Sequence, residues 1–283
     1  MLTEDWLIKT NIELSKNNIK HLARPMAAIS AYAKEFKIPV GFNSQIALKI
    51  SDWFKSNTRQ DTGLMAALFE STYFYDGEFW VLDIPFFWGS VKLEPFNSLK
   101  NMPDSIKERL INDSDYSIDF VRHWANCFDL GLGYNEISQT MYNIRFGLGF
   151  FKAGIEELQS AATLLREHKL NSRILQNSRM AVEMFFKSYA ALRNKLNDEE
   201  ARKISHDLTK GLEKLVIISG NQKYTSIASE LSVYPLIKDR YVAQNASTID
   251  LWNAFRLAQK IGAIVARELS SFDALSEIES KIV

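Results

Sequence analysis

Three charged side chains recur at helical spacing inside an apolar segment that we expect to form a helix over about residues 173–196. Arg179, Glu183 and Lys187 stand four residues apart, and they therefore form one row along a single helix face. A solvated set of ion pairs explains such a row and stabilises a helix by about 0.2–0.5 kcal/mol per pair. The alternative is a polar groove in which Glu183 orients the two cations toward an anionic ligand.

The next predicted helix begins within the motif Ser205-His206-Asp207-Leu208, with Ser205 as the expected cap. Free backbone N–H groups and the helix dipole make such an end favourable for anions. His206 is suited to donate to a phosphate or to act as an acid or base. A structural explanation competes with this one, because a histidine can pack at a helix start and Asp207 there complements the dipole.

A third polar element, Arg240-Tyr241, lies in the loop ahead of the last predicted helix. An arginine beside an aromatic ring suits phosphate clamping and base stacking. The alternative is an arginine that ties the loop to neighbouring helix ends. The candidate ligand-binding residues are therefore Arg179, Glu183, Lys187, His206, Asp207, Arg240 and Tyr241.

The order of these motifs is more specific than any one of them. A helix with Glu183-x-x-x-Lys187, then His206-Asp207-Leu208, then Arg240-Tyr241 and a long closing helix resembles the HEPN domain (higher eukaryotes and prokaryotes nucleotide-binding). The resemblance covers about residues 140–270. It implies an up-and-down helical bundle that commonly forms a homodimer. The implied roles are nucleotide binding, metal-independent RNA cleavage, or non-catalytic support of larger bacterial defence and stress systems.

The ribonuclease members of that family carry Arg-x4–6-His, and this chain departs from the pattern. Arg193 is followed by the carboxylates Asp198, Glu199 and Glu200 where the histidine would fall. A shifted motif remains, in which Arg202 and His206 are separated by three residues.

We therefore expect a non-catalytic module that binds a nucleotide or RNA. Two alternatives stay open: a metal-independent endoribonuclease that uses Arg202 and His206, and an interaction or dimerisation scaffold without a ligand site.

The segment 69–96 is unusually aromatic, and its charge argues against nucleic acid. Ten aromatic side chains accompany a single basic residue, Lys92. Single-strand binding sheets combine stacking rings with Lys and Arg. The segment is therefore interpreted as hydrophobic core or as a surface for a protein partner.

Composition narrows the class of protein further. The chain contains one cysteine, Cys127, and no apolar run of the roughly 18–20 residues that a membrane helix needs. Phosphate-loop, dinucleotide and zinc-protease motifs are absent from the sequence. Formal net charge is zero, although residues 60–140 contain 13 acidic and 5 basic residues. We expect a cytoplasmic protein without a membrane span, a cofactor or a metal site.

The hydrophobic pattern predicts a mainly α protein of two domains. An α+β domain with an aromatic hairpin occupies residues 1–134, and a HEPN-like, up-and-down antiparallel helical bundle occupies 135–283. Gly131 and Gly133 are taken as the linker between them. The N-terminal domain is expected to contain helices over 5–37 (kinked or split at Pro25), 43–56, 60–71 and 104–128.

The remaining expected elements are a sheet and four longer helices. Asp76-Gly77 predicts a type I′ hairpin turn between two strands, and a short third strand is expected at 90–93. The bundle helices are expected over 136–168, 173–196, 206–220 and 248–270.

Overall fold

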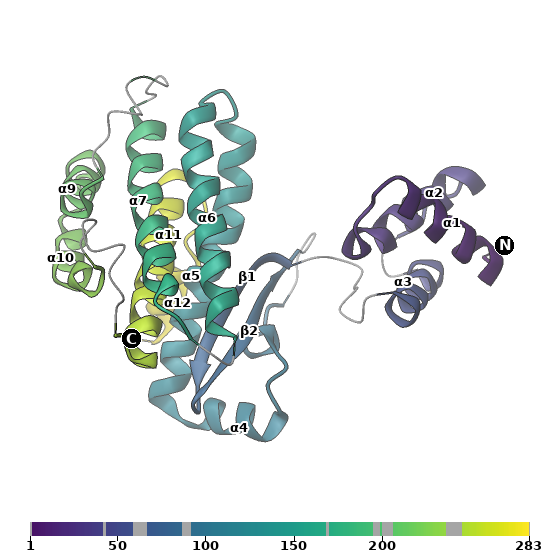
Figure 1. Ribbon diagram of the computed structural model, residues 1–283, viewed down its shortest axis with the longest axis horizontal. Coiled ribbons are helices and arrows are strands. Elements are labelled where there is room, and N and C mark those ends of the chain that lie inside the picture. The colour runs from purple at the N-terminus through teal and green to yellow at the C-terminus, as the bar shows by residue number, and fades with distance from the viewer. Residues whose placement is uncertain are drawn as a thin grey trace. The chain divides into compact units, whose positions relative to one another are not determined.

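The computed structural model describes residues 2–41, 44–58, 67–86, 92–167, 170–194, 199, 206–235 and 245–282. The protein is mainly α-helical with a small three-stranded antiparallel sheet, as the sequence predicts (Figure 1). It forms two compact units. One comprises Met1–Leu68 with Pro85–Val91, and the other comprises Phe69–Ile84 with Lys92–Val283.

The described residues of the first unit form three α-helices and a short 3₁₀ turn at His21–Ala23. The α-helices are α1 (Glu4–Lys16), α2 (Arg24–Phe36) and α3 (Gln45–Asn57). The predicted segment 5–37 is divided between Lys16 and Arg24, and Pro25 lies in the first turn of α2, where its missing N–H costs no helical hydrogen bond. Ser44 caps α3 by accepting a hydrogen bond from the amide of Ala47. Apolar side chains of the three helices form a common core, which includes Leu7, Ile29, Tyr32, Ile50 and Phe54.

The aromatic segment forms the predicted hairpin. Its sheet consists of β1 (Ala67–Tyr75), β2 (Glu78–Pro85) and β3 (Leu99–Lys100) in that order. Asp76 and Gly77 both have positive φ angles, 55° and 80°, as a type I′ turn requires. In the antiparallel pairing of β2 with β3, Val81 lies opposite Lys100.

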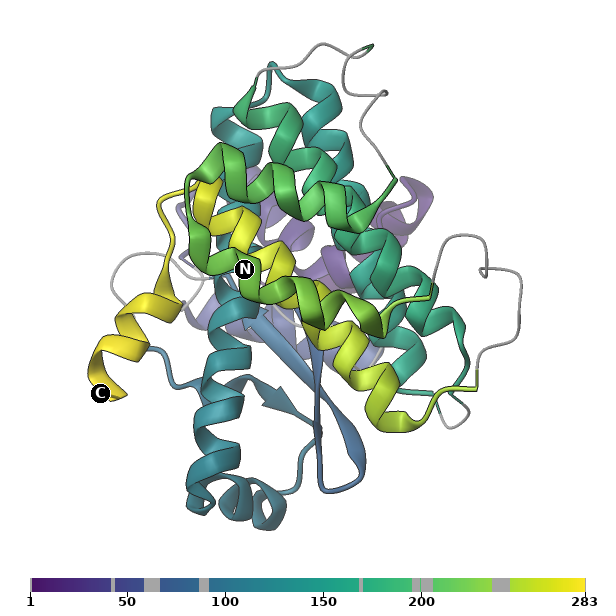
Figure 2. The same cartoon turned by 90° about the vertical axis from the view of Figure 1, so that its left-hand side faces the viewer.

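The second unit is a helical bundle against which the hairpin packs. Its long helices are α5 (Ser114–Thr140), α6 (Arg145–Leu165), α7 (Arg173–Arg193) and α11 (Thr248–Leu269). Shorter elements accompany them: α4 (Asp104–Asn112), α9 (Leu208–Ser219), α10 (Ile227–Glu230), α12 (Ala274–Ile282) and the 3₁₀ turns at Pro95–Ser98, Gln222–Ser226 and Leu231–Val233. In Figure 2, α9 and α10 face the viewer, and α9 packs against α7.

Contacts along the helices give their relative directions. Gly147 and Gly154 of α6 lie against Leu192 and Phe185 of α7, so these two helices are antiparallel. Gly262 of α11 also lies against Phe185, and Glu268 lies near Arg193. Hence α11 runs in the same direction as α7. Two helices that run in the same direction need a connection that leads back to the starting end. Here that connection includes α9, α10 and the 3₁₀ turns, which lie between α7 and α11 in sequence.

Several local predictions are wrong. Residues 67–71 belong to β1 and not to a helix, while 60–66 lie outside the described residues. The third strand is Leu99–Lys100, and the described part of 90–93 is not a strand. The predicted linker lies inside α5, which is continuous to Thr140. A Cβ at Gly133 would lie 2.9 Å from Cβ of Ala266, so this glycine permits helix contact and does not mark a break.

The predicted domain boundary after residue 134 therefore falls within a helix, and the two compact units divide elsewhere. Among the helices that the structure describes, none has both the length and the apolar character needed to cross a bilayer.

Phe185 fixes the spacing of three bundle helices. Its ring is fully buried, with Gly154 of α6 and Gly262 of α11 each in close contact with it. A Cβ built at either glycine would lie 2.7 Å from a ring carbon. Because the ring is confined by both helices, it cannot move away from one without approaching the other.

We predict that Gly262→Ala destabilises the bundle by about 1–3 kcal/mol, because the added methyl overpacks the Phe185 ring. Gly149→Ala is the matched control, since Gly149 is exposed in α6 with open space around its Cα. That variant should gain about 0.5–1 kcal/mol from helix propensity. Urea unfolding of both variants measures the difference. Equal stabilities would contradict the close packing around Phe185.

Candidate functional site

The charged row of α7 faces into the protein. Glu183 is 2% exposed, and the side chains of Arg179 and Lys187 are 12% and 6% exposed. The interpretation as a solvated set of ion pairs is therefore wrong. The three side chains form a buried cluster with His206, which precedes α9.

Glu183 is the centre of this cluster. Its Oε1 lies 3.0 Å from Nζ of Lys187 and 2.7 Å from Nδ1 of His206. Its Oε2 lies 3.4 Å from Nη1 of Arg179. A buried carboxylate is costly unless its charge is neutralised and its lone pairs accept hydrogen bonds, and both conditions are met here.

Arg179 connects α7 to two other segments. Its Nε donates to the carbonyl of Pro235 at 3.1 Å, and its Nη2 donates to the carbonyl of His206 at 3.2 Å. These bonds fix the backbone on which His206 stands. Lys187 is held from another side, with Nζ 5.7 Å from the centre of the Phe150 ring.

His206 is the exposed member, with 66% of its side chain accessible. An ionised carboxylate only accepts hydrogen bonds, so Nδ1 of His206 must carry the proton that it shares with Glu183. In the neutral ring this leaves Nε2 as an acceptor for solvent or a ligand. Lys187 lies 3.2 Å from the same Nδ1 and has only donors, so the two side chains share Glu183 and do not bond to each other.

Asp207 has a structural role in the described contacts. It caps α9 by accepting hydrogen bonds from the amides of Thr209 and Lys210, at 2.9 and 3.4 Å. The cap is Asp207, and Ser205 lies outside the described residues. Two of the backbone amides at this helix start are therefore already bonded to a carboxylate, and the predicted anion site there stays a prediction.

Other predicted site residues lie outside the part of the chain that the structure describes. They are Arg202, Arg240 and Tyr241. Of the three carboxylates that stand where the family's histidine would fall, Glu199 has helical backbone. Asp198 and Glu200 lie outside the described residues. The structure thus brings together four of the predicted ligand-binding residues, Arg179, Glu183, Lys187 and His206, and places Asp207 beside them.

The aromatic segment supplies hydrophobic core. Tyr73 packs edge-on against Phe120 of α5 and Trp252 of α11. Phe69, Tyr73 and Phe79 are buried, and burial raises the pKa of Tyr73, with Asp119 adding to the rise. These contacts favour the interpretation of the aromatic segment as hydrophobic core and disfavour a base-stacking surface.

Sequence reasoning missed a polar seam between α5 and α11. Asp119 pairs with Arg256, and the buried Asp129 accepts from Arg267 at 2.8 Å. His123 is fully enclosed beside the carbonyl of Thr72, and burial lowers its pKa to about 3. The signal was present in α11, because Arg256, Lys260 and Arg267 are separated by four and seven residues and share one face.

No protein-family model, curated protein or solved structure matches this chain. The resemblance to the HEPN domain therefore stays a prediction. Within the residues that the structure describes, no group of three or more His, Cys, Asp or Glu side chains is arranged to hold a metal ion.

We predict that Glu183→Gln destabilises the second unit by about 3–5 kcal/mol, because it leaves the buried cations Arg179 and Lys187 without their counter-charge. Glu156→Gln is the control, since Glu156 is 62% exposed and lies 3.7 Å from Lys152 on the same helix face. Loss of this exposed ion pair should lower the free energy of unfolding by about 0.5 kcal/mol or less. Urea unfolding compares the two. A Glu183→Gln variant as stable as the control would show that the cluster is not desolvated.

Proposed function

We propose that this protein is a non-catalytic binding module for a nucleotide or RNA, built on a HEPN-like helical bundle. The observation that carries the proposal is the position of His206, which is exposed above a buried cluster of two cations and one carboxylate. A phosphate group is the ligand chemistry that such an arrangement favours.

The charges of the cluster support this ligand. Arg179 and Lys187 together exceed the charge of Glu183 by one positive unit, in surroundings where little water screens it. Asp207 lies next in sequence, but its carboxylate is engaged by amides of α9. A phosphate accepts hydrogen bonds, so His206 would bind it as the doubly protonated ring, with Nδ1–H on Glu183 and Nε2–H on the phosphate. Arg240 and Tyr241 are proposed as further contacts to phosphate and base.

We predict that His206→Ala weakens binding of a phosphate-bearing ligand about tenfold or more, the cost of one hydrogen bond to a charged group. Calorimetric titration with a panel of nucleotides and single-stranded and structured RNAs measures this. Lys214→Ala is the control, because Lys214 is exposed on α9 outside the cluster. Its affinity should equal that of the unmodified protein.

Arg240→Ala should weaken binding by a similar factor if the loop arginine clamps the ligand. The proposal fails if no member of the panel binds. It also fails if the affinity is the same in the unmodified protein, His206→Ala and Arg240→Ala.

A second candidate function, metal-independent RNA cleavage, is favoured by one specific contact. The bond from Nδ1 of His206 to Glu183 is 2.7 Å long, and a carboxylate that orients a histidine in this way prepares Nε2 as a general base. In such a reaction Nε2 would take the proton of the RNA 2′-hydroxyl as that oxygen attacks the adjacent phosphorus. The bond from phosphorus to the 5′-oxygen of the next nucleotide would break, which leaves a 2′,3′-cyclic phosphate, and the departing 5′-oxygen would take a proton from water. Arg202 is the proposed partner for the phosphate.

We predict that any cleavage of end-labelled RNA in the presence of a metal chelator is lost in His206→Ala. His21→Ala is the matched control, because His21 is exposed in the other compact unit. It should cleave as the unmodified protein does. Cleavage that survives in His206→Ala would exclude His206 as the base, and an inactive unmodified protein would leave the binding proposal as the better account.

A further inference from the structure

A polar groove of about 890 Å³ lies along the seam between α5 and α11, with the 3₁₀ turn at Gln222–Ser226 and α12 on its borders. All the described residues that line it belong to the second unit. None of them is a member of the Glu183 cluster. Six cationic side chains line the groove: Arg122, Arg193, Lys223, Arg256, Lys260 and Arg267.

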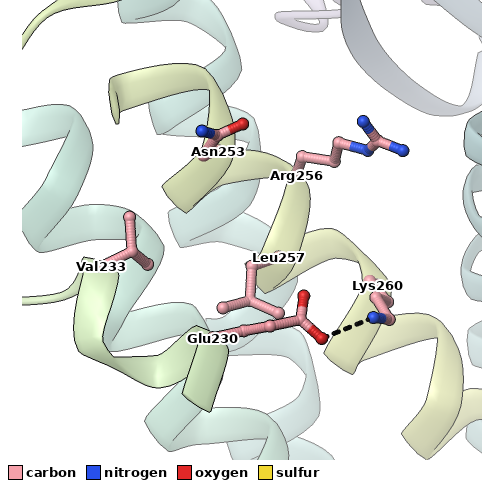
Figure 3. A pocket seen from close by; sticks show the side chains of 6 residues that line it. All are labelled: Glu230, Val233, Asn253, Arg256, Leu257 and Lys260. Carbon is pink, nitrogen blue, oxygen red and sulfur yellow. Dashed lines mark hydrogen bonds and ion pairs between the residues drawn. The ribbon is translucent and has the colours of Figure 1, made fainter. Parts of the chain in front are cut away.

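The cations extend beyond the groove itself. Arg256 and Lys260 also line an adjoining pocket of about 460 Å³ (Figure 3). In that view Nζ of Lys260 meets the carboxylate of Glu230, at 2.9 Å, while the guanidinium of Arg256 points away from this pair. The two cavities thus share two cationic side chains, each of which is paired with a carboxylate.

The cations differ in how firmly they are held. Arg267 is 11% exposed and bound to the buried Asp129, so its role is structural. Arg122 and Arg193 are 49% and 46% exposed, and their nearest carboxylates are 3.5 and 3.9 Å away. Such exposed pairs contribute little to stability, and a ligand with several charges can replace them.

The carboxylates that border the groove come largely from the segment around α12. Glu279 pairs with Arg122, and Asp273 lies 3.9 Å from Arg267, while Glu268 is the lining carboxylate that belongs to α11. Asp119 and Glu230 lie against Arg256 and Lys260. Outside the α12 segment, four carboxylates balance four of the six cations: Asp119, Asp129, Glu230 and Glu268. Asp273 and Glu279 of the α12 segment offset the positive charge that is left.

The rest of the lining indicates the class of ligand. Neutral hydrogen-bonding groups complete the wall, among them Asn126, Asn221, Tyr224 and Ser226. The volume falls in the range of about 300–1,000 Å³ that is usual for small-molecule sites, but such sites are normally mostly apolar. A polar wall with several separate cations suits a small molecule with several negative charges along its length.

We propose that this groove binds a small polyanion with a chain of phosphate groups, of the size of a nucleoside triphosphate. Guanidinium groups bind phosphate oxygens through paired N–H donors, and Lys223 and Lys260 add point charges. The shared chemistry is the polyphosphate chain, which a nucleotide or an inorganic polyphosphate can supply. The proposal is independent of the site at His206, because the two sets of residues do not overlap.

Calorimetric titration of the full chain with tripolyphosphate, ATP and GTP tests the proposal. Lys223→Glu reverses an exposed charge in the groove, and it should weaken binding at least tenfold. Lys214→Glu makes the same change on α9, outside the groove, and should leave the affinity unchanged. Circular dichroism and the urea midpoint establish that each variant is folded. Arg122→Gln is the replacement if Lys223→Glu does not fold.

A third variant reports on α12. Glu279→Gln removes a carboxylate that competes for Arg122, so it should tighten binding several-fold. Comparable affinity for tripolyphosphate and the nucleotides would identify the phosphate chain as the bound element, and preference for ATP or GTP would add the nucleoside.

Absence of binding by all three probes would overturn the proposal, as would equal affinities in the unmodified protein, Lys223→Glu and Lys214→Glu. The His206→Ala variant distinguishes binding in the groove from binding at His206. Binding lost in that variant but kept in Lys223→Glu would place the ligand at His206 and not in the groove.

Discussion

The candidate site depends on one constraint, which is the burial of α7 around most of its circumference. From Ala181 to Leu192 nearly every side chain is buried, because α6, α9 and α11 all pack against this helix. A carboxylate at position 183 must therefore find its counter-charges inside the protein. Arg179 and Lys187 supply them from the same helix face, and His206 completes the set from the chain that enters α9.

Two neighbouring residues of α7 organise different sides of the bundle. Phe185 fills the space that glycines leave in α6 and α11, so its position is set by close packing. Glu183 lies toward α9, where hydrogen bonds and charge determine the arrangement. The packed side holds α7 rigidly, and the polar side can then present the ring of His206 in a defined orientation. This division of roles links the fold to its proposed function.

The sequence predicted the elements whose signals are local. Apolar periodicity located α7 and α11, but it ended one helix near residue 128 and began another near 136, where α5 runs unbroken from Ser114 to Thr140. The positive φ preferences of Asp76 and Gly77 located the hairpin turn. The row of α7 was identified, but periodicity does not reveal which element covers a face, and here α9 covers it. Gly133 was misread because close contact with Ala266 and chain breaking both favour glycine. The groove was missed because its cations come from segments far apart in sequence.

The most direct test of the account is the tautomer of His206. Nitrogen NMR of isotope-labelled histidine distinguishes a neutral ring protonated at Nδ1 from one protonated at Nε2. Because Nδ1 donates to the buried carboxylate of Glu183, we expect the Nδ1–H form in the ligand-free protein, with Nε2 taking up a proton when a phosphate binds. A neutral His206 protonated at Nε2 would mean that Glu183 does not orient the ring, and it would contradict the central claim.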